Sequence, residues 1–124
     1  MESDSRKLAE KIVEYALEKK GQDVTLIKMD EKTIICDYFV IVTGSSRTHN
    51  KAIAEHIAQA LKDEGMNERK YQGKDDGGWI LLDYGSVVVH VFLENLREFY
   101  NLEKLWKDGE IVYVTEPDME MSAQ

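Results

Sequence analysis

The chain of 124 residues contains one cysteine, Cys36, and one proline. A single cysteine excludes an intramolecular disulfide, so nothing in the cysteine usage points to secretion. No apolar run approaches the about 20 residues that a transmembrane helix needs. The first residues, MESDSRKLAEKI, carry acidic side chains that signal and transit peptides avoid. We therefore expect a cytoplasmic protein.

Positive charge is scarce, since 16 Lys and Arg residues stand against 24 Asp and Glu residues and give a net charge of -8. Direct nucleic-acid binding needs clustered Lys and Arg for phosphate contacts, so this balance argues against it. A basic protein remains a suitable partner, because opposite fields speed encounter, although acidity also serves solubility alone. The hydrophobic fraction of 43% is that of an ordinary globular domain.

Residue patterns that carry chemistry are also missing. Local spacing places no histidine near Cys36, which predicts a buried and inert thiol. His49 and His56 lie seven positions apart on one predicted helix, but a zinc site would still need His90. The chain has no HExxH or CxxC pair. We expect no metal and no cofactor.

Gly44 and Ser45 end a predicted strand and open a helix, so their turn can offer backbone N–H groups to an anion. This turn resembles the Gly-Ser turn of nucleotidyltransferases, whose chemistry needs two carboxylates at alternate strand positions to hold magnesium. Residues 47–51 contain no carboxylate, and Asp75 and Asp76 are adjacent in a loop with divergent side chains. We therefore expect that the protein is not an enzyme.

Two segments have apolar residues at the spacing of an amphipathic helix, namely residues 5–20 and a segment that ends near Glu64. Gly21 and Gly65 are the expected C-terminal caps. The expected N-terminal caps are Ser3 or Ser5 for the first helix and Ser46 or Thr48 for the second. A third, short helical turn is predicted to run from a cap at Asn95 through Tyr100.

Strands are predicted at residues 24–29, 37–43 and 111–115, with a short edge strand within 66–71. The run DYFVIVT at 37–43 is nearly continuous in apolar residues, which is typical of a strand buried on both faces. Because a helix follows this strand through a Gly-Ser turn, we predict an α/β fold with a mixed β-sheet and helices packed on it.

A single domain is expected over residues 1–115. The remaining residues, 116–124, are acidic and have no periodic apolar pattern, so we expect a disordered tail.

The richest stretch of the chain, Trp79 to Trp106, begins with a predicted hairpin of strands 79–84 and 87–93. Gly85-Ser86 suits a two-residue turn with glycine first, and Tyr84-Gly85 is the alternative loop. Side-chain alternation gives the same two faces for either loop. The core face is predicted to hold Ile80, Leu82, Tyr84, Val87, Val89 and Val91, and the other face Trp79, Leu81, Asp83, Val88, His90 and Phe92.

The second face mixes an indole, an imidazole and a carboxylate with apolar side chains. Asp83 and His90 are candidates for a dyad in which the carboxylate fixes the imidazole tautomer. The pattern places no nucleophile beside them except Ser86 in the turn, and no oxyanion site is visible. A buried histidine beside Trp79 and a protein-binding face are both open interpretations, since Trp, Tyr and Phe are enriched at binding hot spots.

Three stretches together resemble one known family. CDYFVIVTGSSRTHNKAIAEHI, GWILLDYGSVVVHVF and REFYNLEKLW are similar to the ribosomal silencing factor family, also called Iojap-like, and the similarity covers nearly all of residues 5–114. Two positions depart from the family pattern: Ser86, where the family often has Asp, and Phe99, where it often has Tyr. The loss of the turn carboxylate puts in question only a charge contact at that position.

The resemblance implies a nucleotidyltransferase-like α/β fold without the catalytic carboxylates. It implies a translational repressor that binds the fourteenth protein of the large ribosomal subunit and blocks joining of the small subunit when nutrients are short. Members are often homodimers. Carried onto this sequence, the resemblance places the partner-binding surface on Trp79, Asp83, Tyr84, His90, Phe92, Arg97, Tyr100, Leu102, Glu103 and Trp106.

Two other hypotheses stay open at the level of sequence. One is a residual nucleotidyltransferase that uses Gly44 and Ser45. The other is a homodimerisation module whose aromatic face is buried against a second copy. Tyr84 is a special case within the implied surface, because alternation assigns it to the core face.

Overall fold

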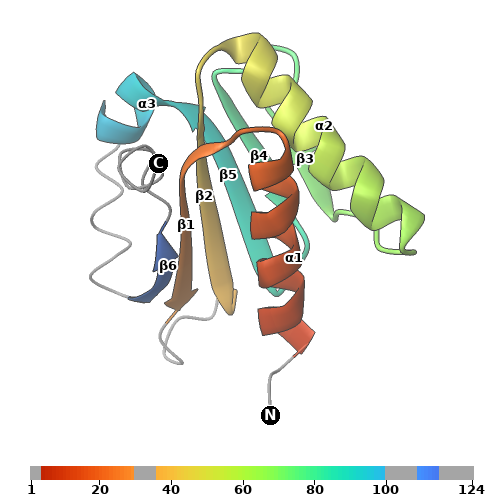
Figure 1. The fold of residues 1–124 in the computed structure, drawn as a ribbon. Helices are drawn as coiled ribbons and strands as arrows, with labels where there is room; N and C mark the ends of the chain where they lie inside the picture. Colours follow the sequence, from red (N-terminus) through yellow and green to blue (C-terminus); the bar gives the residue numbers. More distant parts are fainter. Residues whose placement is uncertain (1–3, 30–35, 100–108, 115–124) are drawn as a thin grey trace.

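A computed structural model of the protein describes residues 4–29, 36–99 and 109–114 (Figure 1). Three helices and six strands are present in this part of the chain. In chain order they are α1 (Asp4–Glu18), β1 (Gln22–Met29), β2 (Tyr38–Gly44), α2 (Arg47–Asp63), β3 (Lys70–Gln72), β4 (Trp79–Asp83), β5 (Val87–Leu93), α3 (Glu94–Phe99) and β6 (Gly109–Val114). The predicted strands and helices are therefore found in the described residues, with ends that differ from the prediction by at most four residues.

The strands form one sheet in the order β3-β4-β5-β2-β1-β6. β2 and β5 are parallel neighbours, and every other pair of neighbours is antiparallel. A parallel pair needs a crossover connection, which here contains α2 and the β3–β4 segment. The mixed α/β fold predicted from the sequence is confirmed.

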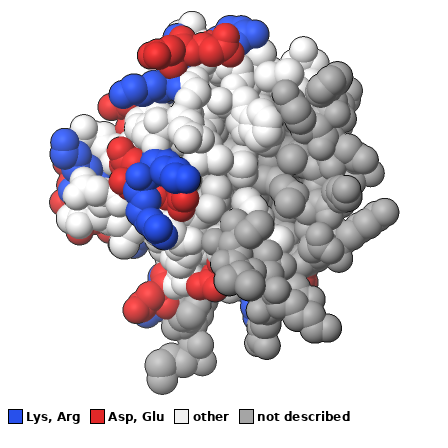
Figure 2. All heavy atoms as spheres, turned by 180° about the vertical axis from the view of Figure 1, so that it is seen from behind, with Lys and Arg blue, Asp and Glu red and all other residues white. Residues whose placement is uncertain are grey.

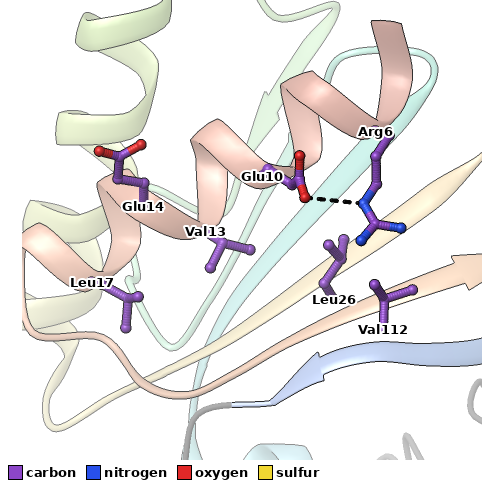
Figure 3. A pocket seen from close by; sticks show the side chains of 7 residues that line it. All are labelled: Arg6, Glu10, Val13, Glu14, Leu17, Leu26 and Val112. Carbon is purple, nitrogen blue, oxygen red and sulfur yellow. Dashed lines mark hydrogen bonds and ion pairs between the residues drawn. The ribbon is translucent and has the colours of Figure 1, made fainter. Parts of the chain in front are cut away.

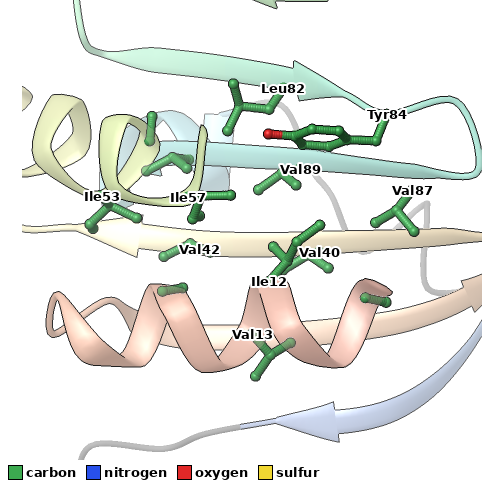
Figure 4. Packing of buried hydrophobic residues seen from close by; sticks show 14 of the residues in the cluster. Ile12, Val13, Val40, Val42, Ile53, Ile57, Leu82, Tyr84, Val87 and Val89 are labelled. Carbon is green, nitrogen blue, oxygen red and sulfur yellow. The ribbon is translucent and has the colours of Figure 1, made fainter. Parts of the chain in front are cut away.

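Helices α1 and α2 pack side by side on one face of the sheet (Figures 1 and 4). Their apolar stripes meet the sheet at Ile12, Ile53 and Ile57, which are fully buried. The sheet supplies the opposing side chains, among them Val40, Val42, Leu82 and Val89 (Figure 4). This is the main core, and all seven residues of β2 are buried, as the continuous apolar run predicted.

A second, smaller cluster lies on the other face of the sheet. Its buried members are Ile27, Met29, Cys36, Phe39, Ile41, Val88 and Phe92. Trp79, Leu81 and Leu96 pack against it and are partly buried. Both faces of the central strands are therefore covered, but the second face has no long helix over it among the described elements.

The observed helix caps agree only in part with those predicted from the sequence. Ser46 caps α2 by accepting a hydrogen bond from the His49 backbone N–H, and Gly65 takes the left-handed conformation after its end, with φ +87°. At the end of α1 the left-handed residue is Lys20, with φ 61°, and not Gly21. Gly21 is required for space instead, because a Cβ there would lie 2.7 Å from Val42 Cγ1.

Two predicted N-caps are wrong because the helices begin earlier than expected. α1 begins at Asp4, so Ser5 lies inside it, and its hydroxyl donates to Asp37 Oδ2 at 2.7 Å. α3 begins at Glu94, so Asn95 lies in its first turn. Ser3, Tyr100, Thr115 and the tail 116–124 lie outside the described residues.

The hairpin has the predicted two-residue loop. Asp83 pairs with Val88, and the Tyr84 N–H donates to the Val87 carbonyl at 2.9 Å, which leaves Gly85 and Ser86 in the loop. Gly85 has φ +85°, a conformation that glycine adopts without steric cost. The alternative loop Tyr84-Gly85 is excluded, and the two predicted faces of the hairpin are those that the structure shows.

In the part of the chain that the structure describes, no helix is long and apolar enough to cross a membrane.

Candidate functional site

The candidate site is a partly exposed row of side chains on the sheet face opposite α1 and α2. β4 contributes Trp79, Leu81 and Asp83, which alternate onto this face and are neither fully buried nor fully exposed. β3 contributes Lys70 and Gln72, which pair with Asp83 and Leu81 and are exposed. Paired residues of antiparallel strands point to the same side, so these five residues form one surface, here called the Trp79 face.

Seen from behind, the molecule presents this side of the sheet to the viewer (Figure 2). The described atoms in the middle of this view belong mostly to residues other than Lys, Arg, Asp and Glu, and a cluster of charged side chains lies to their left.

The indole of Trp79 is held in place by side chains of the neighbouring strand β5. Its ring stacks on Phe92 with centroids 5.3 Å apart and planes 26° apart, and its Nε1–H donates to His90 Nδ1 at 3.0 Å. His90 in turn lies between Phe39 and Phe92, at centroid distances of 5.4 and 5.8 Å. A side chain fixed by packing and a hydrogen bond loses little further freedom when a partner binds.

His90 is held in its neutral form. Only 8% of it is exposed, and this burial lowers its pKa from 6.5 to about 4. Because Nδ1 accepts the hydrogen bond from Trp79, the ring proton belongs on Nε2. The imidazole therefore acts as a structural acceptor that orients the indole.

Acidification is expected to weaken the fold through His90. The unfolded chain takes up a proton on this residue below about pH 6.5, but the folded protein does so only near pH 4, so stability present above pH 6.5 is lost as the pH falls between these values. The loss amounts to about 3 kcal/mol over this interval. Urea unfolding at several pH values should show a shallower pH dependence for His90→Asn than for the wild type. Equal slopes for the two proteins would refute this role.

The predicted dyad of Asp83 and His90 is not formed. Asp83 Oδ1 accepts a hydrogen bond of 2.7 Å from the Gly85 backbone N–H and so stabilises the hairpin turn. In the strand register His90 stands opposite Leu81, and its ring nitrogen is used by Trp79. Alternation placed both residues on the correct face, but the register determines which of them meet.

Three residues of the implied partner-binding surface are buried. Phe92 is 0% exposed, and His90 and Tyr84 are 8% and 9% exposed. Tyr84 lies in the main core on the helix side, as alternation predicted. This corrects the expectation that the three lie on the surface: His90 and Phe92 support the Trp79 face from within the sheet, and Tyr84 belongs to the opposite side.

Trp79 and Asp83 lie on the Trp79 face as expected. The side chain of Arg97 and the residues Tyr100, Leu102, Glu103 and Trp106 lie outside the described part of the chain. Leu81, Lys70 and Gln72 were missed as site residues. Alternation with Trp79 was the signal for Leu81, whereas the β3 pair depends on a register that the sequence does not reveal.

The Gly44-Ser45 turn is occupied by contacts within the protein. The Ser45 N–H donates to His49 Nδ1 at 2.9 Å, and His49 Nε2 donates to the Lys19 carbonyl at 2.7 Å. A Cβ on Gly44 would lie 1.8 Å from Asn50 Oδ1, so glycine is required for the close approach of α2. The turn therefore joins the end of α1 to the start of α2, and the Ser45 N–H is not available to an anion.

The loop 73–78 contacts the same helix start. Arg47 forms an ion pair with Asp76, Asn50 Nδ2 donates to the Gly77 carbonyl at 2.7 Å, and Gly78 N–H donates to Asp76 Oδ2 at 3.0 Å. Asp76 is thus engaged by Arg47 and the loop backbone.

Within residues 4–29, 36–99 and 109–114, no group of three His, Cys, Asp or Glu side chains is arranged to hold a metal ion. Cys36 is buried, its Sγ lies 3.3 Å from the Tyr38 carbonyl, and burial raises its thiol pKa to about 11. A thiol with so high a pKa is a poor nucleophile at neutral pH.

Comparison with known proteins gives consistent matches. The family described as "ribosomal silencing factor during starvation" matches residues 2–124. A curated relative from Bacillus subtilis, named ribosomal silencing factor RsfS, is 39% identical over 92 residues, which cover 74% of this chain and 78% of the relative. A mouse relative named mitochondrial assembly of ribosomal large subunit protein 1 is 33% identical over 98 residues, covering 77% of this chain and 43% of the relative.

The fold also matches a solved structure. A crystal structure of a protein from Chromobacterium violaceum superposes with a TM-score of 0.80 at 30% sequence identity, and the match covers 85% of this chain and 88% of the other.

Proposed function

The chain belongs to the ribosomal silencing factor family, and we propose that it represses translation by binding the large ribosomal subunit. In this proposal it docks on the fourteenth protein of that subunit, in the cytoplasm, and blocks joining of the small subunit when nutrients are short. The description of the matching family supports the link to silencing and starvation. The name of the mouse relative, mitochondrial assembly of ribosomal large subunit protein 1, supports the choice of the large subunit.

The observation that carries the proposal is the Trp79 face. A partly exposed indole, fixed by Phe92 and His90, lies beside Leu81 with charged Asp83 and Lys70 at the margin. Tryptophan is among the residues most enriched at binding hot spots, and a rigid apolar centre with a polar rim gives a hot spot its protection from water.

Charge supports the same kind of partner. A net charge of -8 attracts a basic protein and repels exposed RNA phosphates, so contact through a ribosomal protein is favoured over contact through RNA. Blocking subunit joining requires only that a bound domain occupies the space of the other subunit. No catalytic step is needed, which agrees with the structural contacts that fill the Gly44-Ser45 turn.

Centrifugation with separated ribosomal subunits tests the proposal. The protein is expected to pellet with large subunits and not with small subunits at moderate salt, and to reduce the yield of joined ribosomes when it is added before mixing. Equal pelleting with both subunits, or none with either, would contradict the proposal. A concentration-dependent dimer that excludes large-subunit binding would assign the face to self-association instead.

A further inference from the structure

A second surface of the molecule lies on the opposite side of the sheet. A groove of about 300 Å³ separates α1 from the β1–β6 edge (Figure 3). Val13 and Leu17 of α1 point toward Leu26 of β1 and Val112 of β6 across it. This volume is at the lower end of the range for pockets that hold small ligands or a few side chains.

The floor and the mouth of the groove differ in character. Leu26 and Val13 are buried at 1% and 7% exposure, whereas Leu17 and Val112 remain partly exposed. The groove therefore offers an apolar lining that solvent still reaches, and filling it would remove that apolar area from water.

Charged side chains border the groove. Arg6 Nε and Glu10 Oε2 form an ion pair of 3.2 Å, with 29% and 43% of their side chains exposed. Glu14, which also lines the groove, is exposed and has no ion-pair partner within the described residues. One cation and two carboxylates leave the border with a net negative charge, so an incoming cation is favoured over an anion.

The neighbouring strand edge favours an extended occupant. β6 is the last strand of the sheet, and within the described residues no strand pairs with its outer edge. An extended peptide can add to such an edge through backbone hydrogen bonds. Every second side chain of the added strand would then point toward α1, on the side where Val112 borders the groove.

Charge disfavours two other occupants. Residues 116–124 contain Glu116, Asp118 and Glu120 but no Lys or Arg, so the acidic border repels them. A second copy of the chain also brings a net charge of -8. A basic segment of a different protein is the occupant that the border favours.

We propose that the groove between α1 and β6 docks an extended segment of a partner protein that carries both apolar side chains and lysine or arginine on its side facing α1. The inference goes beyond the proposed ribosome contact, because the groove lies on the helix side of the sheet and the Trp79 face on the other. Both surfaces are available at once, so a copy bound through one face still presents the other to a second partner.

A peptide titration tests the groove. The probe is an acetylated and amidated hexapeptide with valine, lysine and leucine at alternate positions and serine between them, added to the full chain while methyl signals are followed by NMR. Shifts are expected at Val13, Leu17, Leu26 and Val112. A peptide with glutamate in place of lysine, and one with serine in place of the apolar residues, should each bind at least about tenfold more weakly.

Two variants and a matched control distinguish docking in the groove from nonspecific electrostatic attraction to the acidic protein. Val112→Trp fills the groove from a partly exposed position and should abolish the shifts, and Glu14→Lys should weaken binding about fivefold. Asp75→Lys makes the same charge change on the exposed loop before β4 and should leave binding within about twofold. Equal losses for the two charge variants, or no shift in these methyl groups at about 1 mM peptide, would overturn the proposal.

Large-subunit binding by the Val112→Trp variant separates this inference from the proposed function. Retained pelleting together with lost peptide binding is expected for two independent surfaces. Self-association that shifts the same four methyl groups would assign the groove to a second copy and so overturn the choice of a basic partner.

Discussion

Replacing Trp79 by alanine is expected to weaken binding to the large ribosomal subunit by at least about 30-fold, because truncation of a central hot-spot residue removes about 2 kcal/mol or more. The indole provides a large apolar area on the Trp79 face, and Phe92 and His90 fix its orientation. Trp79→Phe keeps part of the ring stack and should lose less. Pelleting with purified large subunits over a range of protein concentrations measures both effects.

The variant must be separated from a merely less stable protein. Trp79→Ala leaves His90 Nδ1 without its donor and is expected to lower the free energy of unfolding by about 3 kcal/mol. Tyr71→Ala is the matched control, since Tyr71 is a partly buried aromatic that packs against the main core and donates to Glu55. It should lose stability but keep ribosome binding. If both variants bind as the wild type does, the Trp79 face is not the contact surface.

Replacing Phe92 by alanine is expected to lower the free energy of unfolding by about 4 kcal/mol, one of the largest effects of a single substitution in this chain. Phe92 is 0% exposed, and its ring contacts both Trp79 and His90. Removal of the ring leaves a cavity that the surrounding strands cannot fill, because β5 is paired on both sides. Urea denaturation followed by circular dichroism measures the change.

Phe92→Leu provides the control for this prediction. It keeps most of the apolar volume and should cost about 1 kcal/mol. Subunit binding by Phe92→Leu should stay close to that of the wild type, since the side chain supports the face without contacting the partner. If Phe92→Ala is as stable as the wild type but does not bind the large subunit, Phe92 itself contacts the partner and the prediction is wrong.

The division of the hairpin into two faces was fully predictable from the sequence. A two-residue loop fixes the pairing of β4 with β5, and alternation then places Ile80, Leu82 and Val89 on one side and Trp79 on the other. Alternation does not show how deeply each side chain is buried. Phe92 and Leu81 lie on the same face, but Phe92 is fully buried and Leu81 is partly exposed. The reason is that β5 lies inside the sheet, whereas β4 lies near its edge, where only the short β3 follows.

Helix ends were less predictable for a similar reason. Gly21 has the residue type expected for a left-handed cap, but packing against Val42 and the Ala16 carbonyl leaves no room for a side chain at that position. Lys20 adopts the left-handed conformation in its place, and the Gly21 N–H returns to the Ala16 carbonyl at 2.9 Å. Tertiary contacts thus decide which of two adjacent residues takes the strained conformation.

The candidate site was predicted by resemblance more than by chemistry. The residue types on β4 and β5 indicated an unusual face of the hairpin, and the family resemblance assigned a partner to that face. Neither argument predicted the hydrogen bond between Trp79 and His90. That bond depends on the register of β4 against β5, in which Trp79 stands opposite Phe92 and diagonal to His90. The same register places Asp83 next to the turn, where its carboxylate accepts a hydrogen bond from the Gly85 N–H.

The parallel pairing of β2 with β5 has a consequence for the order of folding. Each residue of β2 meets a partner 49 positions further along the chain, from Tyr38 with Val87 to Gly44 with Leu93, whereas Asp83 and Val88 of the hairpin are five positions apart. Closing the longer loop carries the larger entropic barrier, so the hairpin is free to form first. Phe39, which backs His90, arrives only with β2. The hairpin alone therefore brings Trp79 onto Phe92 and His90, and the pairing of β2 with β5 then adds Phe39 behind His90.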